Sequence, residues 1–149
     1  MKQFSFSLEK VLELRKYNED EAKLELGRAI GVLADLENRI LLLGQERARA
    51  ASSQFKPGNS AAQIQQYMFY LIRLDNTKEQ LLKEAAMAEL KVEEAREAFI
   101  EASRERKVLD KLKEKRQKEY RKEMLAEETK ALDDISGGTP ARDSVLGSL

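Results

Sequence analysis

The chain has 149 residues, with 27 Lys and Arg against 27 Asp and Glu, and no His, Cys or Trp. Without Cys there are no disulfides, thiolate nucleophiles or cysteine metal sites, and without His the commonest general base and transition-metal ligand is missing. No glycine-rich phosphate loop is present, and paired carboxylates such as Glu93 and Glu94 are typical of a solvated helix face. The composition therefore predicts a protein that is not an enzyme and that uses no cofactor, no metal and no small-molecule substrate.

Charged residues make up 36% of the chain and apolar residues 42%. The apolar share is ordinary for a globular protein, whereas the charged share exceeds the usual value of about 25%. No apolar run approaches the roughly 20 residues that span a membrane, and the first ten residues lack the apolar core of a secretory leader. We therefore expect a single unit located in the cytoplasm.

Glycine and proline interrupt the chain at few places, and the one clear interior turn is residues 54–59, with Pro57 and Gly58. Directly after it, Ser60 and Gln63 fit a capping box, in which each side chain accepts the backbone N–H of the other residue. No Gly or Pro occurs among the 76 residues of 60–135. The sequence predicts one unit over 1–135, with a helix at 7–53 capped by Ser7, a turn at 54–59 and a helix at 60–135. The tail, 136–149, is expected to be disordered.

Apolar residues recur in both segments at alternating steps of three and four. Ten of thirteen such positions from Leu8 to Ala50 are apolar, as are eleven of twelve from Ile64 to Ala102. A repeat of 3.5 residues sustained over this length is typical of a coiled-coil seam. The predicted fold class is all-α: an antiparallel two-helix coiled-coil hairpin with a longer, overhanging second helix.

The expected register follows from the turn, because a short turn makes the two helices antiparallel. If Ala50 faces Ile64, the numbers of facing residues add to 114, and Leu8 should face position 106. The apolar stripe of the second segment stops just before that position, after Ala102. We therefore expect the second helix to continue beyond its partner by roughly 25–30 residues, or about 40 Å. Phe4 and Phe6 are expected to pack back on this overhang near Leu109 and Leu112.

The zero net charge conceals unlike segments. Residues 104–122, here called the basic segment, carry 10 basic and 4 acidic side chains, and residues 123–149 carry 2 and 6. This surface could be a solvated helix, a docking site for an acidic protein partner or a nucleic-acid site, although scarce aromatics and interspersed Glu disfavour nucleic acid. The candidate partner-binding residues of the basic segment are Arg104, Arg106, Lys107, Lys111, Lys113, Lys115, Arg116, Lys118, Arg121 and Lys122.

Aromatic residues gather near the turn, where four of the nine fall within residues 55–70. Helix geometry directs Phe69 away from the seam, and the expected register brings Leu41 and Leu42 to the same level. An exposed apolar patch of this kind usually marks an interface, although packing near the turn is an alternative explanation. The candidate tip surface consists of Leu41, Leu42, Tyr67, Phe69, Tyr70 and Leu74.

Three stretches in this order resemble the flagellar FliJ proteins. The first runs from Phe4 and Phe6 through Leu8, Glu9, Val11 and Leu12 to Leu14 and Arg15. The second is Gly58 with Ser60-Ala61-Ala62, followed by Tyr67, Tyr70 and Leu74. The third begins at Ala102-Ser103-Arg104-Glu105-Arg106-Lys107, reaches Arg116 and Tyr120, and is followed by Leu132-Asp133-Asp134. The resemblance covers roughly residues 4–135.

The resemblance implies a soluble component of the flagellar type III protein export apparatus, required for flagellum biogenesis and motility. Such proteins form a stalk in the export ATPase ring, contact the export gate at the cytoplasmic side of the membrane, and act as general or escort chaperones. We expect the basic segment to bind the ATPase ring and the tip surface to bind the gate or another component. Export chaperones are further candidate partners, and we expect no nucleic acid partner. The alternatives are another coiled-coil scaffold and the stalk protein of a secretion injectisome.

Overall fold

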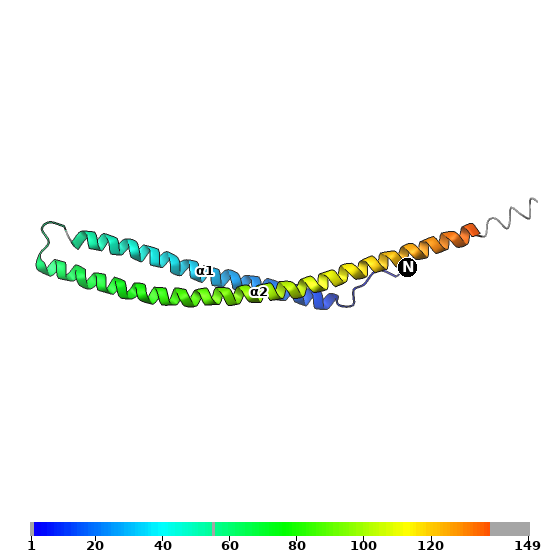
Figure 1. Ribbon diagram of the computed structural model, residues 1–149, viewed down its shortest axis with the longest axis horizontal. Helices are drawn as coiled ribbons and strands as arrows, with labels where there is room; N and C mark the ends of the chain where they lie inside the picture. Colours follow the sequence, from blue (N-terminus) through cyan, green and yellow to red (C-terminus); the bar gives the residue numbers. More distant parts are fainter. Residues whose placement is uncertain (1, 55, 138–149) are drawn as a thin grey trace, which may run out of the picture. The chain divides into compact units, whose positions relative to one another are not determined.

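The computed structural model describes residues 2–54 and 56–137, so the predicted tail beyond Gly137 lies outside the described residues. Within these ranges the chain consists of two helices and no strand: α1, Glu9–Gln54, and α2, Ala61–Gly137 (Figure 1). The predicted all-α fold, a two-helix hairpin with a longer second helix, is confirmed. No helix in the described ranges is long and apolar enough to cross a membrane.

The chain divides into two compact units, each containing part of both helices. The hairpin unit is Tyr17–Ser103, and the terminal unit is Met1–Lys16 with Arg104–Leu149. Within the hairpin unit, α1 and α2 lie side by side and run in opposite directions (Figure 1). Leu36 packs there with Ala85 and Ala88, and Leu33, Ile40 and Leu81 pack around this cluster.

The seam predicted from the heptad spacing is the packed face of both helices. The buried apolar side chains of the described residues are Leu12, Leu36 and Ala50 on α1 and Ala85, Ala88 and Val92 on α2. All six lie on the predicted stripe. Leu12 is the one large side chain of the described residues that is fully buried, at 0% exposure. A two-helix seam therefore leaves most of the molecule's side chains in solvent.

The turn and its caps follow directly from the local sequence. The Ser60 backbone N–H donates to Gln63 Oε1 at 2.8 Å, and the Gln63 N–H donates to Ser60 Oγ at 3.2 Å, which confirms the capping box. Gly58 has φ of +93°, a conformation that glycine adopts without a steric cost. The Asn59 side-chain amide donates to the carbonyls of Ser53 and Gln54, which closes the carboxyl end of α1.

The register, however, differs from the expected one by about one heptad. In the hairpin unit the Arg47 guanidinium meets Asp75 and the Ser103 hydroxyl donates to Glu19, and both pairs of numbers add to 122 rather than 114. The first six residues of α2, 61–66, are all exposed, because in this register α2 begins beyond the end of α1. The prediction failed because a shift of seven residues keeps every seam position opposite a seam position.

The same shift corrects the prediction about where pairing stops. In the terminal unit Arg15 meets Glu105 at 2.6 Å and Lys113 meets Glu9 at 2.8 Å, so α1 continues to pair well beyond Ala102. The seam therefore does not end there: it combines these ion pairs with the buried Leu12. From Lys113, at the level of the first residue of α1, α2 continues for 24 residues to Gly137.

The amino-terminal segment extends the paired region further. The Phe4 and Tyr120 rings lie 5.6 Å apart, and the Tyr120 hydroxyl donates to the Lys2 carbonyl. The segment therefore packs back on α2, with its contact at Tyr120; packing near Leu109 and Leu112 stays a prediction. From residue 125 to Gly137 every side chain is exposed.

Candidate interaction surfaces

The basic segment forms a lysine face in the terminal unit. Steps of four, four, three and four residues separate Lys107, Lys111, Lys115, Lys118 and Lys122, and such steps place side chains on one helix face. At about 100° per residue, this face lies roughly opposite the residues that pack against the amino-terminal part of the chain. All five side chains are exposed. We call these five residues the lysine face.

Two acidic side chains border the lysine face. Glu114 and Glu119 line a shallow hollow together with Lys111, Lys115, Lys118 and Lys122. The face is therefore positive along its centre and mixed along its edges. An acidic surface with matching cations at its rim would complement it better than a uniformly negative one.

Five of the ten predicted cations lie outside the lysine face, and two of these five make the ion pairs described next. Lys113 makes its ion pair with Glu9 across the helix interface, and Arg106 pairs with Asp110 on its own helix with only 25% of its side chain exposed. Arg116 lies beside the amino-terminal segment, where it borders a hollow with Phe4 and Phe6. Arg104 and Arg121 are exposed. The sequence identified the segment, and the register decided which of its charges face solvent.

The predicted tip surface separates into two parts. Phe69, with 58% of its surface exposed, lies on the outer side of α2 with Met68 and Ile72. Leu41 and Leu42 are also exposed, but the observed register places them near the level of residues 80–81. That is about eight residues, or roughly 12 Å, from the level that the expected register predicted. The structure therefore does not bring Leu41 and Leu42 together with Phe69.

Tyr67, Tyr70 and Leu74 are half-buried, and Leu74 occupies a seam position as the heptad pattern indicated. Tyr67, Phe69 and Tyr70 line a shallow hollow with Arg73, whose guanidinium lies 5.7 Å from the centre of the Tyr70 ring. Such a hollow offers aromatic faces, a cation and polar rims within a small area. Tyrosine and arginine side chains of this kind often contribute most of the binding energy at protein interfaces.

A polar cluster at the tip could not be found from the sequence. The Tyr70 hydroxyl donates to Glu46 Oε1 at 2.8 Å, and the same carboxylate accepts from Arg49. These two hydrogen bonds, led by the one from Arg49, lower the pKa of Glu46 to about 2. The hydrogen bond to Glu46 also raises the pKa of Tyr70. Because the contact joins residues on different helices, it depends on the register, which the heptad pattern predicted wrongly.

The Arg47–Asp75 pair ties the helices together close to this cluster. The guanidinium donates to both carboxylate oxygens, at 2.6 and 3.3 Å. This bidentate geometry lowers the pKa of Asp75 and raises that of Arg47 through the hydrogen bond and the Coulomb attraction. Arg47 is one of the three seam positions of α1 that are not apolar, and Asp75 is its partner on α2.

These observations define an all-helical coiled-coil protein whose distinctive chemistry lies on outward helix faces and not in a closed pocket. Among the described residues, no group of three or more acidic side chains is arranged to hold a metal ion.

The comparisons with known proteins give the family. The sequence profile of the family described as Flagellar FliJ protein matches residues 4–143. A relative, the Flagellar FliJ protein of Bacillus subtilis (strain 168), is 26% identical over 140 residues, which is 89% of this chain and 92% of that protein. The chain therefore belongs to the flagellar FliJ family and is a component of the flagellar export apparatus. No solved structure matches the chain.

Proposed function

We propose that this protein couples the export ATPase ring to the membrane export gate of the flagellar type III apparatus. Within this proposal, the lysine face binds the ATPase ring, and the hollow around Phe69 and Tyr70 binds the cytoplasmic domain of the gate. The protein would then act at the cytoplasmic side of the cell membrane without spanning it. Its mechanism is contact: a stalk favours one nucleotide state of the ATPase only if it binds that state more tightly.

The observation that carries the proposal is the direction of the lysine face. Its five lysines leave the packed side of α2 free for the amino-terminal segment while presenting charge outward. Charge arranged in this way steers a partner of opposite sign and makes association depend on salt. Membership of the flagellar FliJ family supports a partner within the export apparatus, and the exposed lysine face supports a partner with an acidic surface.

The ATPase contact is tested by reversing charge on the lysine face. The double variant Lys111→Glu and Lys115→Glu should weaken binding to the purified export ATPase at least tenfold, measured by calorimetry at low salt. The matched control is Lys23→Glu with Lys83→Glu, which changes the net charge equally at exposed positions of the hairpin unit. Equal affinity of both double variants at low and high salt would refute the role of the lysine face.

The gate contact is tested at the tip. The double variant Phe69→Ser and Ile72→Ser should reduce binding to the cytoplasmic domain of the gate and leave ATPase binding unchanged. Leu90→Ser is the control, because Leu90 is exposed on the same helix at 65% but lies outside the hollow. Retained gate binding by the double variant would show that the tip surface is inert.

We also propose that the protein acts as a general or escort chaperone for export substrates. The exposed apolar side chains of the hairpin unit support this role, because an exposed apolar surface holds unfolded or partly folded chains. A light-scattering assay should show that a substoichiometric to equimolar amount of the protein suppresses aggregation of a flagellar export substrate. No suppression at equimolar concentration would remove the chaperone role and leave the coupling role standing.

A further inference from the structure

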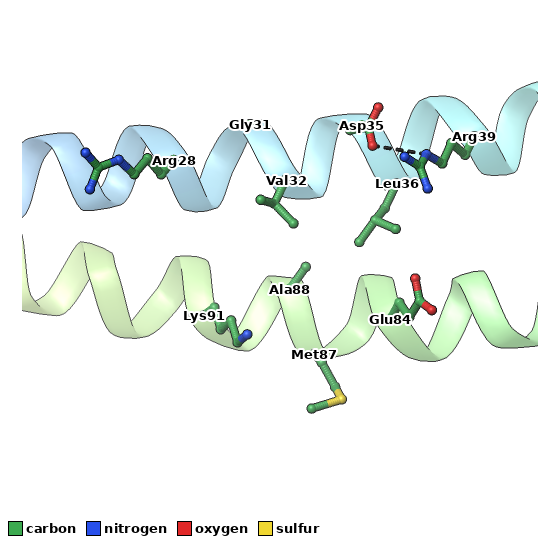
Figure 2. Close-up of a pocket in the computed structure, with 10 residues that line it drawn as sticks. All are labelled: Arg28, Gly31, Val32, Asp35, Leu36, Arg39, Glu84, Met87, Ala88 and Lys91. Carbon is green, nitrogen blue, oxygen red and sulfur yellow. Dashed lines mark ion pairs between the residues drawn. The ribbon is translucent and has the colours of Figure 1, made fainter.

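A groove runs along one side of the hairpin unit between α1 and α2. Its floor contains Leu36 and Ala88, and Figure 2 shows these side chains and Val32 pointing toward the opposite helix. Val32 and Met87 border it at nearly the same level and remain 56% and 64% exposed. A second hollow that shares Val32 and Ala88 continues the groove along the helices.

The charges that line the groove come in pairs of opposite sign, with the two members of each pair at similar distances on either side of its centre. Arg28 and Asp35 stand on either side of Val32 on α1, and Lys91 and Glu84 stand on either side of Met87 on α2. Further out on α1, Glu25 and Arg39 lie at equal distances in sequence from Val32. Six of the seven charged residues that line the two hollows thus form three pairs of opposite sign, and only Glu94 has no counterpart.

From this pattern we propose that the groove is a self-association surface whose occupant is the same groove of a second copy of the chain. In a two-fold dimer one patch must complement itself, so each charge must meet its opposite after rotation. A two-fold axis that crosses both helices at the level of Val32 and Met87 satisfies this condition. It places Arg28 against Asp35 of the second copy, Lys91 against its Glu84, and Arg39 against its Glu25.

The charges also exclude the other face-to-face arrangement. An axis parallel to the helices would lay α1 over α2 of the second copy, with Arg28 against Lys91 and Asp35 against Glu84. Those contacts join like charges, which opposes association. The charge pattern therefore selects one geometry, in which α1 crosses α1 and α2 crosses α2 in opposite directions. The product is a four-helix bundle over the hairpin unit.

Two further features agree with this occupant. Gly31 lies in the groove beside Val32, and a side chain added there would meet nothing within 4 Å in the same chain. A glycine inside a helix is less favourable than an alanine, and the close approach of a second backbone at the dimer axis would explain its presence. The ion pairs that Arg28 and Arg39 now make, with Glu25 and Asp35, are exposed contacts within one helix, which exchange partners at little cost.

The inference is independent of the proposed coupling role, because the groove shares no residue with the lysine face or the tip hollow. Its test is the mass of the full chain by sedimentation equilibrium over a wide range of concentration. We expect a concentration-dependent rise from 17.0 kDa toward twice that mass. A constant monomer mass up to near-millimolar concentration would overturn the proposal.

Charge reversal tests the geometry. Arg28→Asp makes positions 28 and 35 both acidic, and Asp35→Arg makes both basic, so each variant alone should associate at least tenfold more weakly than the wild type. An equimolar mixture of the two should recover dimers, because each acidic pair then meets a basic pair. Circular dichroism confirms that each variant is folded. Unchanged dimerisation of the single variants, or a mixture that stays monomeric, would refute the assigned contacts.

Disulfide trapping gives a second readout, since the natural chain contains no cysteine. Gly31→Cys lies close to the proposed axis and should cross-link rapidly to its own copy under mild oxidation. Val108→Cys is the control, because Val108 is exposed at 65% in the terminal unit and lies outside the groove. Equal cross-linking rates for the two variants would contradict an interface centred on the groove.

Discussion

Leu12 provides the sharpest test of the packing, because it is the one fully buried large side chain of the described residues. Replacing Leu12 with Ala removes three carbon atoms from the seam, at about 0.8 kcal/mol for each buried methylene. The transfer loss is then roughly 2.4 kcal/mol. The cavity adds little, because a two-helix seam can collapse or admit water. We expect a loss of about 2–3 kcal/mol in the free energy of unfolding of the terminal unit.

The assay is urea denaturation followed by circular dichroism at the helix band. Leu14→Ala is the matched control, since Leu14 lies two residues away on the same helix but is 55% exposed. It should cost less than about 0.5 kcal/mol. If Leu12→Ala and Leu14→Ala shift the unfolding midpoint equally, the assigned packing of the terminal unit is wrong.

Three further predictions concern polar contacts. Because its pKa is lowered to about 2, Glu46 stabilises the fold above the ordinary carboxyl pKa, and this contribution disappears as pH falls toward 2. Glu46→Gln should therefore reduce the drop in urea midpoint between pH 5 and pH 2.5; an identical drop would contradict this. A double-mutant cycle on Arg15 and Glu105 should give a coupling of about 0.2–1 kcal/mol that decreases with salt, whereas zero coupling at low salt would argue against the register. Ser60→Ala should cost about 1 kcal/mol by removing the cap of α2, measured by urea denaturation against Ser52→Ala as control.

Much of the secondary structure could be read from local patterns. The heptad stripe located the packed face, including Leu12, Leu36 and Val92, because burial on a helix depends on position within the repeat. The capping box at Ser60 and the glycine at position 58 also formed as expected, since each depends on residues only a few positions apart. These are interactions whose geometry a short segment specifies by itself.

The candidate surfaces were less accessible to sequence reasoning. Composition shows the excess of positive charge in residues 104–122, but it does not distinguish Lys113 and Arg106 from the exposed cations of this segment. Their ion pairs with Glu9 and Asp110 remove them from the lysine face. Likewise, the tip cluster of Tyr70, Glu46 and Arg49 requires knowledge of which levels of the two helices meet.

The sequence by itself determined that this protein is a two-helix coiled coil, where its helices break, which faces they bury, and to which family it belongs. Only the tertiary structure decided the register, because a seam that repeats every seven residues is equally apolar after a shift of one heptad. The shift is selected by the path of the turn and by cross-helix pairs such as Arg47 with Asp75 and Lys113 with Glu9. That choice in turn fixed how far α1 and the amino-terminal segment extend along α2, and therefore which charges of a chain with no net charge face solvent.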